Sequence, residues 1–180
     1  MDDTQLWDFG MARLNALLSS LPVESSEVLA DLLARYRAAK EDLAAVVAAV
    51  DAAAICCECQ GQCCLNGKYR MNVCDALACL AAQTAPTVDF TRKPVCPYGT
   101  AAGCTMEPGL RPADCILFLC DGIDRKLSPH DRLLCAELEQ ILREFIREAS
   151  RLTGEQVGTP LLLWAEKQNT SSKFMVQRQA

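Results

Sequence analysis

Two long stretches of the chain carry apolar residues at helical spacing. The first begins after Ser25 or Ser26, either of which can cap a helix, and its apolar positions step alternately by three and four. That spacing is typical of a helix-packing seam. The positions are Leu29, Leu32, Tyr36, Ala39, Leu43, Val46, Val50 and Ala53. They predict one long helix that leads directly into the first cysteines.

The second stretch follows Ser128-Pro129-His130-Asp131, which supplies a cap, a proline at the first helical position and an acidic residue three positions after the cap. Gly154 ends it. Its apolar positions are Leu134, Leu138, Ile141, Leu142, Phe145, Ala149 and Leu152. Two amphipathic helices of similar length on either side of a middle segment pack most simply as an antiparallel pair. We therefore expect an all-α fold, with long helices bundled around or beside an irregular cysteine-rich segment.

Shorter helices complete the expected fold. Residues 2–20 form one that breaks at Pro22, Thr159-Pro160 starts another, and only Ala76–Gln83, capped by Asn72 or Asp75, looks helical in the middle segment. We expect a single domain, residues 1–180, in four parts. These are N-terminal helices in 1–55, a cysteine-rich metal-binding segment in 56–126, C-terminal helices in 127–167 and a flexible tail in 168–180.

Composition and charge narrow the class of protein. A hydrophobic content of 51% is enough to bury a core. The net charge of -5 and the pI of 4.9 argue against nucleic acid as a partner. Apolar runs such as Ala44–Val50 are far shorter than the about 20 residues that cross a bilayer, so we expect no membrane association. The acidic start Met1–Gln5 is unlike a secretory signal, and we expect a cytoplasmic location.

Cysteine is the unusual residue of this chain. There are 12 cysteines, and eleven of them lie in residues 56–126. In a reducing compartment, a dense cysteine pattern favours a metal site over a disulfide framework. The same segment contains seven basic and seven acidic residues. A neutral segment of this kind is well suited to thiolates, whose negative charge a metal cation offsets.

The cysteines fall into two clusters. In the first, the two-residue gap between Cys56 and Cys59 lets two sulfurs converge on one ion, and Gly61 allows the chain to fold back. The second includes Arg111-Pro112, where the proline restricts the arginine, so that Arg111 is expected to hydrogen-bond a carbonyl or carboxylate near the sulfurs. The candidate metal ligands are Cys56, Cys59, Cys63, Cys64, Cys96, Cys104, Cys115 and Cys120.

Four further cysteines and the one histidine stand outside this ligand set. Cys74, Cys79 and Cys135 lie in or beside expected helices and are interpreted as packing residues. Cys57 continues the apolar seam and is able to replace Cys56 as a ligand. His130 sits in a helix cap, where a surface or capping role is expected. No catalytic residue is predicted.

The order of the eight candidate cysteines, together with Arg111-Pro112 and Phe118, resembles the CxxCxxCC family of zinc- or iron-chelating proteins. A related cysteine region occurs in flagellin lysine methylases, where it is associated with an iron–sulfur cluster. The likeness covers residues 56 to 120. The chain departs from the family in having three residues before Cys63, one extra residue between Cys104 and Arg111, and Ile116 where an arginine commonly stands.

The leading functional hypothesis is a cytoplasmic metal-binding protein that uses zinc or an iron–sulfur cluster, for structure, redox sensing or metal handling. Both metals accept four thiolates, and the sequence leaves the choice open. The alternatives are a methylase-like accessory protein with an iron–sulfur cluster, a thiol–disulfide exchanger and a helical protein-interaction module. An enzyme is less expected than a binding protein, because no Gly-rich cofactor loop is present. The expected partners are the metal ion and a protein partner, or a second copy bound through the helical seam.

Overall fold

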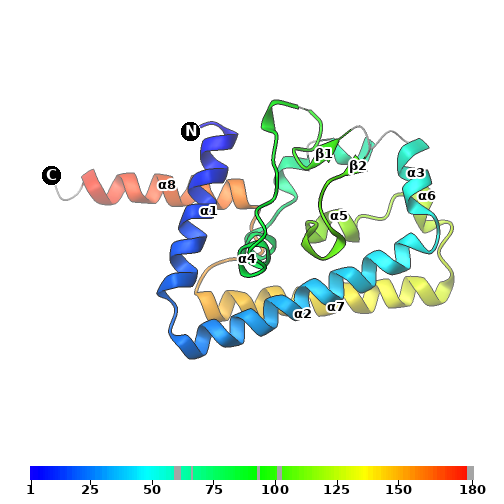
Figure 1. The fold of residues 1–180 in the computed structure, drawn as a ribbon, viewed down its shortest axis with the longest axis horizontal. Helices are drawn as coiled ribbons and strands as arrows, with labels where there is room; N and C mark the ends of the chain where they lie inside the picture. The colour runs from blue at the N-terminus through cyan, green and yellow to red at the C-terminus, as the bar shows by residue number, and fades with distance from the viewer. Residues whose placement is uncertain (59–61, 66, 93, 101–102, 178–180) are drawn as a thin grey trace.

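Helices account for nearly all of the regular structure. The computed structural model describes residues 1–58, 62–65, 67–92, 94–100 and 103–177, with only the backbone described at Cys63 and at 171–177. Within these ranges there are eight α-helices and one two-stranded sheet (Figure 1). The expected all-α fold is confirmed.

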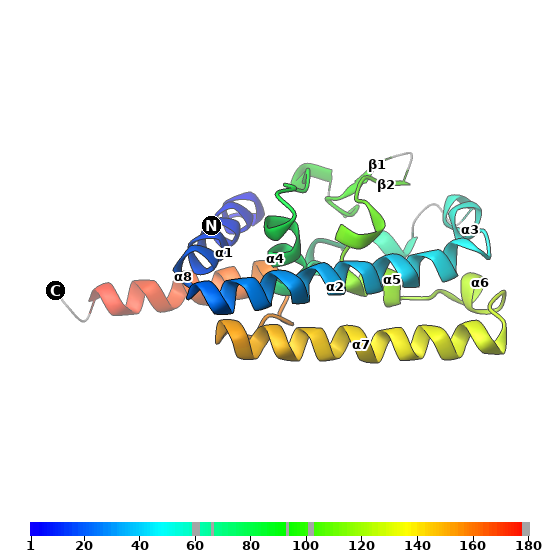
Figure 2. The same cartoon turned by 60° about the horizontal axis from the view of Figure 1, so that its bottom comes forward.

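Helices α2 (Val23–Ala48) and α7 (Pro129–Thr153) form the scaffold. They lie side by side and run in opposite directions, and α8 (Leu161–Gln177) extends beyond one end of the pair (Figures 1 and 2). Tyr36 of α2 meets Phe145 of α7 edge to face, with ring centroids 6.5 Å apart. The seam residues from Leu29 to Leu43 are buried within the one chain, and burying a leucine side chain contributes about 1.5–3 kcal/mol. The antiparallel pairing is confirmed.

The bounds of α7 follow from its end residues. The Ser128 hydroxyl accepts the Asp131 backbone N–H at 3.1 Å, and the Asp131 carboxylate accepts the Ser128 backbone N–H at 3.3 Å. This reciprocal pair satisfies two N–H groups that the first turn leaves without helical partners. At the other end, Gly154 adopts φ 71°, a left-handed angle that glycine takes without strain. Both ends agree with the sequence-based prediction.

The first long helix is shorter than its apolar seam predicts. Helix α2 ends at Ala48, Asp51 adopts φ 57°, and a separate helix α3 (Ala52–Glu58) follows. The prediction of one helix through Ala53 was therefore wrong. The apolar pattern shows where apolar residues recur, but it carries no signal for a single residue with left-handed backbone angles. Aspartate adopts such angles more readily than most residues. The break redirects α3 towards α6 (Asp121–Asp124) at the end of the scaffold.

The two terminal helices pack against each other at the opposite end of the molecule. Helix α1 (Asp3–Ser20) contacts α8 (Leu161–Gln177), and a Cβ at Gly10 would lie 3.1 Å from the Leu161 side chain. Helix α8 continues well beyond Lys167, where a flexible tail was expected. No proline or glycine interrupts residues 161–177, so nothing local stops the helix. Residues 178–180 of the expected tail lie outside the described residues.

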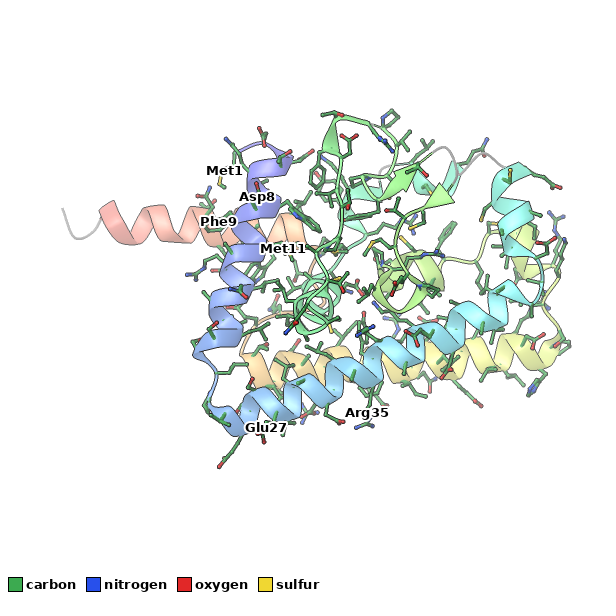
Figure 3. The ribbon with its side chains drawn as sticks, in the orientation of Figure 1. Met1, Asp8, Phe9, Met11, Glu27 and Arg35 are labelled. Carbon is green, nitrogen blue, oxygen red and sulfur yellow. The ribbon has the colours of Figure 1, made fainter. Side chains whose placement is uncertain are left out.

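The middle segment lies against one side of α2. Glu27 and Arg35 mark the other side of that helix, which is turned away from the segment (Figure 3). Helices α5 and α6, and α3 from Cys56 onwards, form where irregular chain was expected, because runs of only four to seven residues are too short to show periodicity. The other elements are η1 (Gln62–Cys64), η2 (Gly67–Tyr69), α4 (Val73–Ala81), η3 (Phe90–Arg92), β1 (Gly99–Thr100), β2 (Gly103–Cys104), η4 (Pro108–Leu110) and α5 (Ala113–Leu117).

The described helices include none with the length and apolar character needed to span a bilayer.

Candidate metal centre

Cys96 lies at the start of a tight turn whose backbone faces its sulfur. The backbone N–H of Gly99 donates to the Cys96 carbonyl oxygen at 3.0 Å, which closes the turn. The backbone N–H of Tyr98 lowers the pKa of the Cys96 thiol against the larger, raising effect of burial. Pro97 has its own φ angle fixed by its ring. An amide that donates to a cysteine sulfur stabilises the thiolate, the form that binds metal.

A short hairpin carries Cys104 back to this turn. Strands β1 and β2 are antiparallel, and Gly99 pairs with Cys104. Thr105 donates both its backbone N–H and its hydroxyl to the Tyr98 carbonyl oxygen, each at 3.0 Å. These hydrogen bonds fix the return strand beside the Cys96 turn. The Cys104 thiol is exposed, and a negative charge on it would raise the pKa of Cys96.

Helix α5 carries a third cysteine that interacts electrostatically with the other two. Burial raises the pKa of the Cys115 thiol, the Arg70 guanidinium lowers it in part, and Cys96 and Cys104 raise it further. The three cysteines come from three segments of the chain. Across the described ranges, however, no three Cys, His, Asp or Glu side chains lie together so that they could hold a metal ion.

The chain just after the first cysteine cluster packs closely against Cys96 at Gly67. A Cβ at Gly67 would lie 2.7 Å from the Cys96 sulfur, closer than any real side chain is found. Only glycine allows η2 to pack there. Because η2 follows directly after the first cluster, the chain leaving Cys64 runs against Cys96. Cys64 itself is exposed in η1.

Two other candidate ligands lie further along the scaffold. Cys56 is exposed in α3, and the half-buried Cys120 precedes α6. The two helices are in contact, since a Cβ at Gly122 would lie 3.0 Å from the Ile55 side chain. Both views place this pair beyond α5 and the hairpin (Figures 1 and 2). Of the remaining candidates, Cys59 and the Cys63 side chain lie outside the described residues.

A buried ion pair anchors the segment that carries Cys115. Lys40 Nζ lies 2.9 Å from Asp75 Oδ1, and neither side chain has any exposed surface. Lys40 also donates to the Arg111 carbonyl oxygen at 2.9 Å, while Asp75 accepts the Ala113 backbone N–H at 3.3 Å and the Tyr36 hydroxyl at 2.9 Å. The turn before α5 is thus bound to α2 and α4. The sequence indicated Asp75 only as a helix cap, and nothing in it pointed to Lys40.

Two arginines lie in this part of the chain, Arg111, which the sequence singled out, and Arg70, which it did not. Arg111 donates from Nη2 to the Met106 carbonyl oxygen at 3.4 Å. Arg70 is instead the cation that lowers the pKa of both Cys96 and Cys115 against the larger effect of burial. It is held by a 3.1 Å hydrogen bond to the Asp114 carbonyl oxygen and lies over the Phe118 ring, 5.0 Å from its centroid. Because Arg70 lies far in sequence from the Arg111-Pro112 pair, the cysteine pattern gave no indication of its effect on these thiols.

Three of the four cysteines outside the ligand set behave as core residues, whereas Cys57 is exposed in α3. Cys74 and Cys79 have no exposed surface, and Cys135 is 7% exposed. Burial raises the pKa of Cys79 to about 12 and raises the pKa of Cys74 as well. These thiols therefore stay protonated at neutral pH. His130 is exposed at the start of α7.

Alkylation of the metal-free protein at pH 8 should separate these classes. Cys57 and Cys104 are exposed and should react first, whereas Cys74 and Cys79 should react only after unfolding. After zinc is added, Cys104 should become protected and Cys57 should not. Mass spectrometry of the alkylated peptides measures both patterns. Equal protection of Cys57 and Cys104 by zinc would contradict the assignment of Cys104, and not Cys57, as a metal ligand.

Comparisons with protein-family models, curated proteins and solved structures return no match for the chain. The resemblance to the CxxCxxCC family therefore stays a prediction from the cysteine pattern.

Proposed function

We propose that the chain is a cytoplasmic metal-binding protein whose cysteine thiolates hold zinc or an iron–sulfur cluster. The observation that carries this proposal is the Cys96 turn, where Gly99 pairs with Cys104 and a Cβ at Gly67 would lie 2.7 Å from the Cys96 sulfur. Cys96, Cys104 and Cys115 are the described ligands closest to this turn, and none of the three forms a disulfide. A fourth ligand would come from the first cluster, which Gly67 brings against Cys96.

The surroundings of the three sulfurs fit such a group. The Tyr98 hydroxyl, two residues from Cys96, is buried with no hydrogen-bond partner among the described residues. Arg70 supplies positive charge that partly offsets the thiolates. Thiolates are the preferred protein ligands of both zinc and iron–sulfur clusters.

A centre with four sulfur ligands would be structural or redox-active rather than hydrolytic, because it leaves no position for a reactive water. It would cross-link parts of the chain that already contribute buried residues to the core, such as Tyr98, Met106 and Ile116. Cys96 and Cys104 would tie the hairpin, and Cys115 would tie α5, to the turn at Gly67. Metal binding would then contribute directly to the stability of the middle segment.

Metal analysis of protein purified without oxygen tests this function. We expect stoichiometric zinc in a colourless protein, or iron and sulfide in a brown protein with broad visible absorption. A strong chelator should remove the metal and lower the thermal midpoint, and adding the metal back should restore it. Protein that carries neither metal, takes up neither, and keeps its thermal midpoint in chelator would refute the proposal.

A further inference from the structure

Helix α1 is joined to the Cys96 turn by an aromatic contact. The Trp7 ring centroid lies 6.0 Å from that of Tyr98, which is two residues after Cys96. It also lies 6.0 Å from the centroid of the Phe90 ring, in the chain that leads to the turn. The two partner rings are inclined to the indole by 53° and 59°, as is common for packed aromatic side chains. Helix α1 therefore covers one side of the turn, beside the chain that runs from α4 to β1 (Figures 1 and 2).

A second contact ties the start of α1 to η2. Lys68 Nζ lies 2.9 Å from Asp3 Oδ2 and 3.2 Å from Asp3 Oδ1, and it lies over the Tyr69 ring, 4.7 Å from its centroid. Lys68 directly follows Gly67, where a Cβ would lie 2.7 Å from the Cys96 sulfur. The backbone at Gly67 thus covers the sulfur, and Asp3 helps to hold it there. Cys96 is only 6% exposed as a result.

Helix α1 buries little surface compared with the scaffold. Of its eighteen residues, only Trp7, Gly10 and Leu14 are buried, and the helix packs mainly on α8 and α4. The α2–α7 pair has a long buried seam of its own. Elements with few buried apolar contacts open at a lower free energy than the core does. The backbone at Leu21 is extended and separates α1 from α2, so α1 can move without breaking a continuous helix.

We propose that α1 is a strap whose opening, with the scaffold still folded, exposes the Cys96 thiol to small solutes. Breaking the Asp3–Lys68 pair and withdrawing Trp7 would uncover the turn from two sides. Helix α8 also contacts η2 and would stay in place. The strap would govern access to the sulfur for a thiol reagent and for a metal ion alike. Access to the thiol is a property of the fold, so it can be tested whether or not the protein binds metal.

Alkylation of the full chain with iodoacetamide at pH 8, in the presence of chelator, tests the strap. Cys79 is the internal reference, because it has no exposed surface and its sulfur lies 4.0 Å from the Leu110 carbonyl oxygen of η4. With each rate divided by that of the unfolded chain, Cys96 should react at least about tenfold faster than Cys79. Low concentrations of urea should accelerate Cys79 much more than Cys96, since opening α1 exposes less surface than global unfolding does. Mass spectrometry of the digested protein gives both rates.

Three substitutions should release the strap. Asp3→Asn and Lys68→Met each break the same pair, and each should accelerate Cys96 alkylation by roughly two- to fivefold. They change the local charge in opposite directions, so a direct effect of charge on the thiol would accelerate one variant and slow the other. Trp7→Ala removes the larger contact and should accelerate Cys96 by more than about tenfold.

Leu142→Ala is the matched control in the scaffold. Leu142 has no exposed surface and lies in α7. Its truncation should accelerate Cys79 by roughly twentyfold or more, because Cys79 is reached by global unfolding. It should leave the Cys96 rate within about twofold, because the scaffold stays folded when the strap opens.

Hydrogen exchange of the protein as purified needs neither a variant nor removal of metal. The amides of residues 7–14 in α1 should exchange faster than those of residues 33–43 in α2. Their exchange should also depend less on urea, because it reports the opening of a small unit rather than of the whole fold.

Three results would overturn the proposal. One is a Cys96 rate that all three strap variants leave unchanged, since α8 would then hold η2 without α1. Another is equal acceleration of Cys96 and Cys79 by Leu142→Ala, because Cys96 would then be reached only by global unfolding. The third is exchange in α1 with the same rate and the same urea dependence as in α2. None of these results depends on metal binding, so each is distinct from a failure of the proposed function.

Discussion

Replacing Lys40 with methionine is expected to lower the free energy of unfolding by about 3–5 kcal/mol, because it leaves the Asp75 carboxylate buried without its cation. Methionine matches the lysine stem in length, so packing is largely kept. The carbonyl oxygen of Arg111 loses a donor in the same change. Urea denaturation followed by helical circular dichroism measures the loss. Hydrogen exchange in the turn before α5 should increase together with it.

Lys68→Met is the matched control for this experiment. Lys68 also lies 2.9 Å from its partner, Asp3, but its side chain is 24% exposed, whereas Lys40 is fully buried. A pair open to solvent contributes less than about 1 kcal/mol. Adding Asp75→Asn to Lys40→Met should recover part of the loss, since it removes the unpaired charge. A Lys40 variant no less stable than the Lys68 variant would contradict the assignment of a buried ion pair.

Replacing Cys96 with serine is expected to lower metal affinity by roughly a hundredfold or more. Four ligands share the about 10–16 kcal/mol with which structural zinc binds, so one lost sulfur removes a large part of it. Chelator competition measures the affinity, and metal content after gel filtration checks the stoichiometry.

Cys135→Ser is the control for that variant. The two cysteines are almost equally buried, at 6% and 7% exposed, but Cys135 packs in α7 away from the proposed ligands. Serine there should cost stability and leave metal affinity unchanged. If both variants bind metal as the unmodified protein does, Cys96 is not a ligand. If both variants lose metal affinity equally, the loss comes from placing serine at a buried position and not from removing a metal ligand.

Much of the scaffold could be predicted from the sequence because local signals and packing agree there. The seam of α2 and the stripe of α7 are each long enough to establish a helical period, and Ser128 and Gly154 mark the ends of α7. The cap of α4 was visible as Asn72 followed by Asp75. By contrast, the end of α2 depends on the backbone angle of Asp51, for which the apolar pattern holds no signal.

The ligand set stays a prediction, and the residues that support its cysteines could not be predicted. The cysteine pattern indicated metal chemistry, but among the described residues no three side chains form a group that could hold a metal ion. The roles of Lys40 and Arg70 depend on contacts between residues far apart in sequence, with Asp75 and Asp114 respectively. A single lysine next to an apolar seam resembles any solvated lysine, and only the folded chain shows that it is buried.

The antiparallel pair of α2 and α7 has a consequence during synthesis. The ribosome must complete the whole intervening segment before α7 exists to cover the inner residues of α2, so this pairing closes a long loop and forms late. Until then, Tyr36 of α2 lacks the Phe145 ring that it meets in the folded protein. Nascent chains should therefore expose the apolar face of α2, and be most prone to aggregation, in the interval before α7 has been synthesised.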